Sequence, residues 1–199
     1  MIPFTSLTGL SEHALLFAGI TLPFTAKLSF RLRLFIFFLG FSSAWIPVKG
    51  LFLAGYTRGL MGDFSISLIM ILLFLIFRYL FRMNVNCLKN AGFSALLVFF
   101  TGLFFYPMSL GLFMFDPYGS AYDPKILSLF LFVIALTAWY LEKYLVVFCI
   151  CAAVLGYLFR ILESDNLWDY VMDPFVFLLS IVYLVFKFIK ERKNEPPLQ

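Results

Sequence analysis

Residues 91–115, AGFSALLVFFTGLFFYPMSLGLFMF, contain no charged side chain. An α-helix needs about 20 mainly apolar residues to cross the hydrocarbon core of a bilayer, within a range of about 17 to 25. The segment therefore predicts a transmembrane helix. Other apolar stretches of similar length predict further spans, and the six together lie at residues 34–55, 64–81, 91–115, 126–141, 144–162 and 174–190.

The composition of the whole chain indicates the same class of protein. Its mean hydropathy is +0.98, and only 13% of its residues are charged, against roughly 25% in soluble domains. The 28 Phe and 10 Tyr suit lipid-facing and interfacial surfaces. We expect one all-α polytopic membrane domain, a bundle of six transmembrane helices over residues 1–190, followed by a short disordered cytoplasmic tail at residues 191–199.

The basic residues predict the orientation. Of the 15 Lys and Arg, 11 fall on one set of alternating connections, and the other set carries only Lys49, Arg58, Lys125 and Arg160. Connections rich in Lys and Arg remain in the cytoplasm. The second, acidic set is therefore expected outside, with both termini cytoplasmic if there are six spans. Short loops and a modest tail favour a plasma membrane of the bacterial inner-membrane type.

The N-terminal stretch Ser11–Ala26 is apolar but short, and it carries Pro23 near its end. It predicts an interfacial or re-entrant helix with Ser11 as its N-cap. The alternative is a seventh span, which would place Met1 outside. Within the first predicted span, Pro47 is expected to kink the helix near Ser43, and Lys49 is expected to extend its ammonium group to the headgroups.

Three aspartates stand immediately before a span that runs from outside to inside. Aspartate is among the best N-cap residues, because its carboxylate accepts hydrogen bonds from free amides of the first helical turn. The position therefore favours a capping role over a catalytic one. The predicted caps are Asp63, Asp123 and Asp173.

Other polar residues of the outer side form a candidate cluster that capping does not explain. An ion pair between Arg58 and Asp63 is expected to close the turn RGLMGD. The stretch Arg160–Tyr170 predicts a short amphipathic helix on the membrane, with Ser164 as a cap and Trp168 as an interfacial anchor. A solvated acidic loop, an anion site at helix N-termini and a divalent-cation site remain open. The cluster comprises Arg58, Asp116, Lys125, Arg160, Glu163, Asp165 and Asp169.

The remaining chemistry of the sequence is sparse. His13 is the single histidine, which excludes metal or haem sites with several histidines and favours an interfacial polar role. Cys87, Cys149 and Cys151 have no zinc or disulfide pattern and suit small apolar fillers. No metal site and no cofactor is predicted. The basic pI comes from the cytoplasmic flanks, so it favours contact with anionic lipid and not with nucleic acid.

Three classes of function fit these features. The first is a non-catalytic accessory subunit, or a membrane protein that binds lipids, a larger membrane protein or a second copy of itself. The second is a small membrane enzyme acting on a phosphate-bearing or lipid-linked substrate at the outer face. The third, a small transporter, requires a polar path that the span centres lack. Convergence of the outer charges on one concavity would favour the enzyme.

Overall fold

The structure is a computed structural model that describes residues 4–82 and 91–194. Over that part of the chain it is all-α, as predicted, with nine α-helices and 77% of the residues helical. The helices are α1 Phe4–Thr21, α2 Phe30–Ser43, α3 Leu53–Met61, α4 Ile66–Phe81, α5 Ala91–Ser109, α6 Lys125–Tyr140, α7 Tyr144–Leu158, α8 Leu167–Val171 and α9 Pro174–Asn194. Two 3₁₀ turns, Leu22–Thr25 and Gly119–Tyr122, and the antiparallel strands β1 Pro47–Val48 and β2 Leu51–Phe52 complete the described elements.

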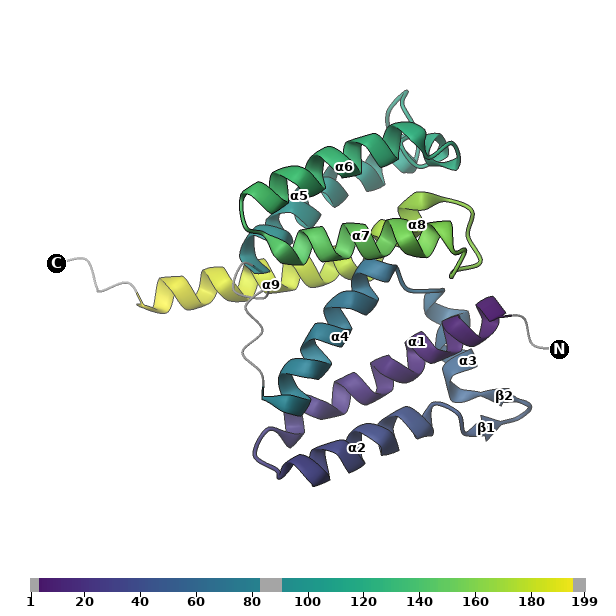
Figure 1. The fold of residues 1–199 in the computed structure, drawn as a ribbon, viewed down its shortest axis with the longest axis vertical. Coiled ribbons are helices and arrows are strands. Elements are labelled where there is room, and N and C mark those ends of the chain that lie inside the picture. The colour runs from purple at the N-terminus through teal and green to yellow at the C-terminus, as the bar shows by residue number, and fades with distance from the viewer. Residues whose placement is uncertain (1–3, 83–90, 195–199) are drawn as a thin grey trace.

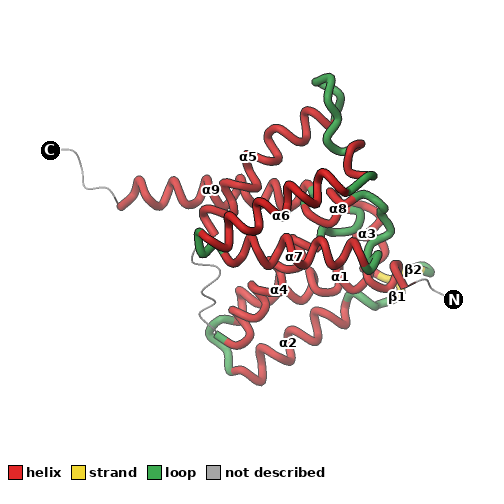
Figure 2. Tube along the Cα trace, turned by 45° about the horizontal axis from the view of Figure 1, so that its top comes forward, coloured by secondary structure: helices red, strands yellow, loops and turns green. Residues whose placement is uncertain are grey.

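The longer helices run back and forth between two ends of the molecule (Figures 1 and 2). One end holds the start of α1, the β1–β2 hairpin, α3 and α8. The opposite end holds the turn from α1 to α2, the turn from α6 to α7 and the end of α9. The first described residues and the last ones therefore lie at opposite ends of the fold.

The helices pack as pairs around a central core. Helix α1 packs along α2 and also contacts α4, whereas α4 and α6 both pack on α7, and α5 packs on α9. The largest buried cluster lies where α4, α6, α7 and α8 meet, and it includes Ile66 and Tyr170. Gly156 of α7 permits this contact, because a Cβ there would lie 2.9 Å from Ile66 and 3.4 Å from Tyr170.

Only α5 among the described helices has both the length and the apolar composition expected of a membrane span. Helices α4, α6 and α7 are apolar but shorter. At 1.5 Å per residue, the 16 residues of α4 extend for about 24 Å, less than the hydrocarbon core of about 30 Å. The helix lengths therefore give support for membrane association through α5 and do not establish the six predicted spans.

The first predicted span, residues 34–55, is wrong as a single helix. Helix α2 ends at Ser43, and a hairpin of β1 and β2 follows. Pro47 has no N–H to continue a helix, while the hairpin turn holds Lys49 at φ 48° and Gly50 at φ 90°, where glycine is unstrained. The expected kink is therefore a helix end, and Lys49 lies exposed in the turn.

The N-terminal stretch also differs from its prediction. Helix α1 already includes Phe4, and the hydroxyl of Ser11 donates to the carbonyl of Leu7 within it, so Ser11 is not an N-cap. Ala14 and Ala18 are completely buried. A Cβ at Gly40 of α2 would lie 3.1 Å from the Cα of Ala18, so small residues bring the two backbones together. Helix α1 therefore packs against α2, α3 and α4, while its Leu7 and Ile20 side chains are exposed.

Other predicted boundaries shift by a few residues. Helix α5 ends at Ser109 and α7 at Leu158, each short of the predicted span end. Helix α9 continues past residue 190 to Asn194. Cys87 and residues 195–199, which include the end of the predicted tail, lie outside the described residues.

Candidate functional site: a polar cavity at one end of the helices

The expected ion pair between Arg58 and Asp63 is present and has a third member. The Arg58 guanidinium donates to Asp63 through Nε and through Nη2, the latter at 2.9 Å. It also lies 2.9 Å from a carboxylate oxygen of Glu163. The hydrogen bonds with Asp63, followed by those with Glu163, raise the pKa of Arg58 above its ordinary value. The guanidinium charge is thus compensated by two carboxylates.

Helix α1 approaches this ion pair closely. A Cβ at Gly9 would overlap the Arg58 guanidinium and the Asp63 carboxylate. One turn earlier, the hydroxyl of Ser6 donates to Glu163 at 3.4 Å. Glycine is therefore required at position 9 for α1 to pass beside the ion pair.

The loop from α3 to α4 is fixed by side chains from two other helices. The amide of Phe64 donates to Glu12 of α1 at 3.1 Å, and the amide of Ser65 donates to Asp173 at 2.7 Å. His13 is completely buried, with its Nε2 3.0 Å from the carbonyl of Gly62. These three contacts hold the loop between α1 and α9.

His13 differs from its prediction, and its neighbour Glu12 is buried as well. His13 packs on the ring of Phe64 with centroids 4.4 Å apart, so it is a core residue and not an interfacial one. Glu12 is 4% exposed, and one of its oxygens has no hydrogen-bond partner among the described residues. Buried polar atoms without partners are uncommon, and this one lies next to the loop that begins α4.

Of the predicted helix caps, only Asp173 makes the capping hydrogen bond. It accepts from the amide of Val176 at 2.8 Å, in the first turn of α9. Helix α4 is capped instead by Ser65, whose hydroxyl accepts from Leu68, because Arg58 engages Asp63. Asp123 makes no side-chain cap of α6.

The short helix after α7 is also capped differently from its prediction. The side chain of Asn166 accepts from the amide of Trp168 and begins α8. Ser164 instead accepts from the amide of Asn166. Trp168 is 8% exposed and donates to the carbonyl of Pro117 at 2.9 Å. It therefore anchors α8 to the loop before α6 and not to a membrane interface.

A polar cavity of about 590 Å³ lies between these elements. Its walls come from the end of α5, the loop before α6, the segment from α7 to α8 and the start of α9. Four of its lining residues are acids. The lining residues are Asp63, Phe105, Tyr106, Ser109, Tyr118, Leu162, Glu163, Ser164, Asp169, Met172, Asp173 and Pro174.

The acids of this cavity have different partners. Asp63 and Glu163 share Arg58, and Asp173 accepts from two backbone amides. Asp169 instead accepts from the hydroxyls of Tyr118, at 3.1 Å, and Ser164. The donors to Asp169 are thus neutral hydroxyl groups, whereas Asp63 and Glu163 are paired with a positively charged guanidinium.

Hydroxyl groups add to the polarity of the cavity. Burial, and then the carboxylate of Asp169, raise the pKa of Tyr118 above its ordinary value. The hydroxyls of Tyr106 and Ser109 are buried, and neither has a hydrogen-bond partner in the part of the chain described. A ligand with donor or acceptor groups would satisfy both.

The predicted cluster converges only in part on this cavity. Glu163 and Asp169 line it, and Arg58 lies behind its wall. Asp116 accepts from the amide of Tyr118 within its own turn, and the exposed Lys125 pairs with Asp123 at 3.4 Å. Arg160 and Asp165 are exposed and do not line the cavity.

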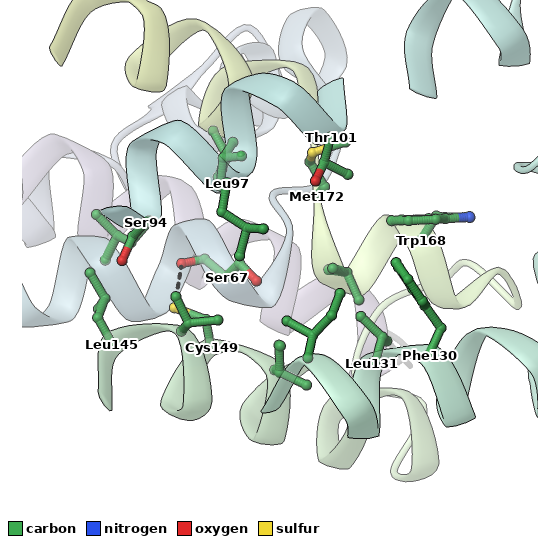
Figure 3. Close-up of a pocket in the computed structure, with 17 residues that line it drawn as sticks. Ser67, Ser94, Leu97, Thr101, Phe130, Leu131, Leu145, Cys149, Trp168 and Met172 are labelled. Atoms are coloured by element: carbon green, nitrogen blue, oxygen red, sulfur yellow. Dashed lines mark hydrogen bonds between the residues drawn. The ribbon is translucent and has the colours of Figure 1, made fainter. Parts of the chain in front are cut away.

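A second, smaller cavity of about 100 Å³ lies deeper between the helices (Figure 3). It lies among α4, α5, α6 and α7, with Trp168 and Met172 near its outer end. Its lining is almost entirely apolar, and the thiol of Cys149 contacts the carbonyl of Ser67 at 3.9 Å. Met172 also lines the polar cavity, so the two cavities share a wall.

Among the described residues, no group of three or more His, Cys, Asp or Glu side chains is placed to hold a metal ion. No protein-family model, curated protein or solved structure matches the chain.

The sequence reasoning missed Glu12, Ser65 and the tyrosines of the cavity. Glu12 carried a usable signal, because an acid within an otherwise apolar helix is expensive to bury and is usually retained for a reason. Tyr106 and Tyr118 carried no such signal, since tyrosines are frequent throughout this chain.

Proposed function

We propose that the protein is a multi-pass integral membrane protein that crosses the bilayer seven times. The support comes from apolar side chains that face outward on helices throughout the fold. Large patches of this kind are rare on soluble monomers. Exposed examples are Phe35 and Phe38 on α2, Phe100 and Phe104 on α5, Phe132 and Leu136 on α6, Phe148 and Leu155 on α7, and Leu179 and Phe186 on α9.

The prediction was six crossings together with an N-terminal interfacial helix. The proposal of seven crossings takes that N-terminal helix as a further span. The proposal counts α1, α2, α4, α5, α6, α7 and α9, which run alternately between the two ends of the fold. Lys27, Arg82 and Lys143 belong to the end that also holds the end of α9, so that end is assigned to the cytoplasm. The start of α1 and the polar cavity are then outside a plasma membrane, such as a bacterial inner membrane.

At its outer face we propose that the protein binds a lipid without transforming it. The observation that carries this is the polar cavity, which opens at the end of the helices where headgroups lie. Its acids and unpaired hydroxyls supply recognition. In that cavity the Ser164 hydroxyl donates to Asp169 and also accepts from the amide of Asn166. Both bonds hold the segment before α8, which favours a structural role for Ser164 and binding over catalysis.

The phosphate-directed enzyme receives less support from this geometry. Arg58 is already held by Asp63 and Glu163. Lys125 and Arg160 lie away from the cavity. A headgroup whose only charge is a phosphate would face four acids in the cavity and no free cation among its described lining residues, which is unfavourable in a partly buried site.

The test is native mass spectrometry of protein purified in mild detergent, with Asp169→Asn and Asp165→Asn compared. Asp169 lines the cavity, whereas Asp165 is an exposed acid four residues earlier that does not. We expect a lipid adduct on the unmodified protein and on Asp165→Asn, and its loss from Asp169→Asn. Equal adducts on both variants would overturn the cavity as the binding site.

A further inference from the structure

The polar and apolar cavities are arranged as one site for an amphiphile. Trp168 lines the apolar cavity and Asp169 lines the polar one. Met172 lines both. These residues belong to α8 and the link to α9, so this short segment separates a polar compartment at the outer end from an apolar compartment between the helices.

The apolar cavity, of about 100 Å³, suits a short stretch of an alkyl chain because of where it lies and what lines it. Leu97 and Thr101 of α5 face Leu145 and Cys149 of α7 across it (Figure 3). Helix α5 packs chiefly on α9, whereas α7 packs on α4, α6 and α8. Helices α5 and α7 contact each other at few positions, so direct packing closes the space between them only in part.

The polar cavity suits a cation. The charge of Arg58 is matched by Asp63 and Glu163 together, and Asp173 lies at the N-terminus of α9 with two amide donors. Asp169 has only hydroxyl donors among the described residues. An ammonium group beside Asp169 would supply the missing positive charge and could donate to the unpaired hydroxyl oxygens of Tyr106 and Ser109.

We propose that the two cavities together bind a lipid with an amine-bearing headgroup. The ammonium lies beside Asp169, within reach of the rings of Tyr106 and Tyr118, and one acyl chain enters the apolar cavity beside Trp168. This rests on the proposed function, and it adds the headgroup class and the position of the chain.

Trp168 provides the readout, because bromine atoms on a nearby acyl chain quench tryptophan fluorescence. In the variant Trp45→Phe/Trp139→Phe, Trp168 is the remaining tryptophan. The purified variant is titrated in detergent with brominated phosphatidylethanolamine and, separately, with brominated phosphatidylglycerol. We expect the amine lipid to quench Trp168 at a concentration about tenfold lower, as one charge-assisted hydrogen bond would give.

Four variants in that background, two of them controls, test the two compartments. Asp169→Asn should remove the preference for the amine lipid, and Asp165→Asn should retain it. Ser94→Leu, which adds volume to the wall of the apolar cavity, should reduce quenching by both lipids. Phe104→Leu, on the exposed face of the same helix, is its control.

The outcomes separate this inference from the proposed function. Equal quenching by the two lipids in the parent variant would overturn the amine preference without any further substitution. Unchanged quenching in a folded Ser94→Leu would overturn the chain position, and so would full competition by soluble ethanolamine with no lipid advantage. In each case a lipid adduct that depends on Asp169 would leave the proposed function standing. Absence of any adduct would overturn both.

Discussion

Glu12 places a buried carboxylate beside the backbone amide of Phe64. Replacement by Ala leaves that buried amide without an acceptor, which costs about 1–3 kcal/mol. Replacement by Gln preserves an acceptor oxygen for that amide. We therefore expect Glu12→Ala to lower the unfolding temperature in detergent clearly more than Glu12→Gln. Equal losses would show that the hydrogen bond with Phe64 does not stabilise the fold.

Gly9 lies against the ion pair of Arg58 and Asp63, and Gly59 in α3 serves as its control position. A Cβ at position 9 would overlap the Arg58 and Asp63 side chains, whereas a Cβ at position 59 meets nothing within 4 Å. Gly9→Ala should therefore destabilise the protein by about 1–3 kcal/mol, the usual cost of overpacking. Gly59→Ala, in α3, should be neutral or stabilising by up to about 1 kcal/mol. Thermal unfolding of both variants checks the prediction, which a stable Gly9→Ala would contradict.

At the scale of elements, two of the three aspartates predicted as caps should behave differently. Asp173→Ala removes acceptors from the amides of both Val176 and Ser65, so we expect a loss of at least about 1–2 kcal/mol. Asp123→Ala removes only an exposed pair with Lys125, which contributes about 0–1 kcal/mol. Chemical unfolding in detergent compares them, and similar losses would contradict this assignment of the caps.

The cap of α4 gives a separate prediction. Ser65 is completely buried and its hydroxyl accepts from Leu68. Ser65→Ala should cost about 1 kcal/mol through the lost cap. Ser65→Thr retains the hydroxyl and serves as the control. An unchanged unfolding temperature for Ser65→Ala would show that Asp173, which accepts from the Ser65 amide, is sufficient to begin the helix.

At the scale of the whole molecule, the number of crossings decides which side each end occupies. In a cysteine-free background, Leu7→Cys, Ser120→Cys and Ser29→Cys report the start of α1, the loop before α6 and the turn before α2; all three positions are exposed. Seven crossings predict that a membrane-impermeant maleimide labels Leu7→Cys and Ser120→Cys on intact cells. Ser29→Cys should be labelled only after permeabilisation.

Two of the three cysteine variants serve as controls for the third, Leu7→Cys. The loop before α6 and the turn before α2 lie at opposite ends of the described fold, so Ser120→Cys and Ser29→Cys calibrate the outer and inner signals. Labelling of Leu7→Cys together with Ser29→Cys, and not with Ser120→Cys, would restore the interfacial helix and six spans.

Several features of the candidate site could be predicted from sequence because they are local. Arg58 and Asp63 are five residues apart across a turn with two glycines, and the ion pair follows from that spacing. Asp173 directly precedes a proline that begins a helix, and it caps that helix. The second partner of Arg58 was not predictable, because Glu163 reaches it only when the segment after α7 folds beside α3.

The sequence by itself determined the all-α class and the two chemically distinct ends, since apolar length and the placement of charge are properties of composition and order. Only the tertiary structure decided that α1 packs against three other helices, that α2 stops before Pro47, and that Asp169 shares a cavity with Tyr106. The physical reason is that burial and hydrogen-bond partners depend on contacts between residues far apart in the chain. An acid on an outer loop therefore becomes part of a site only when other helices provide its surroundings.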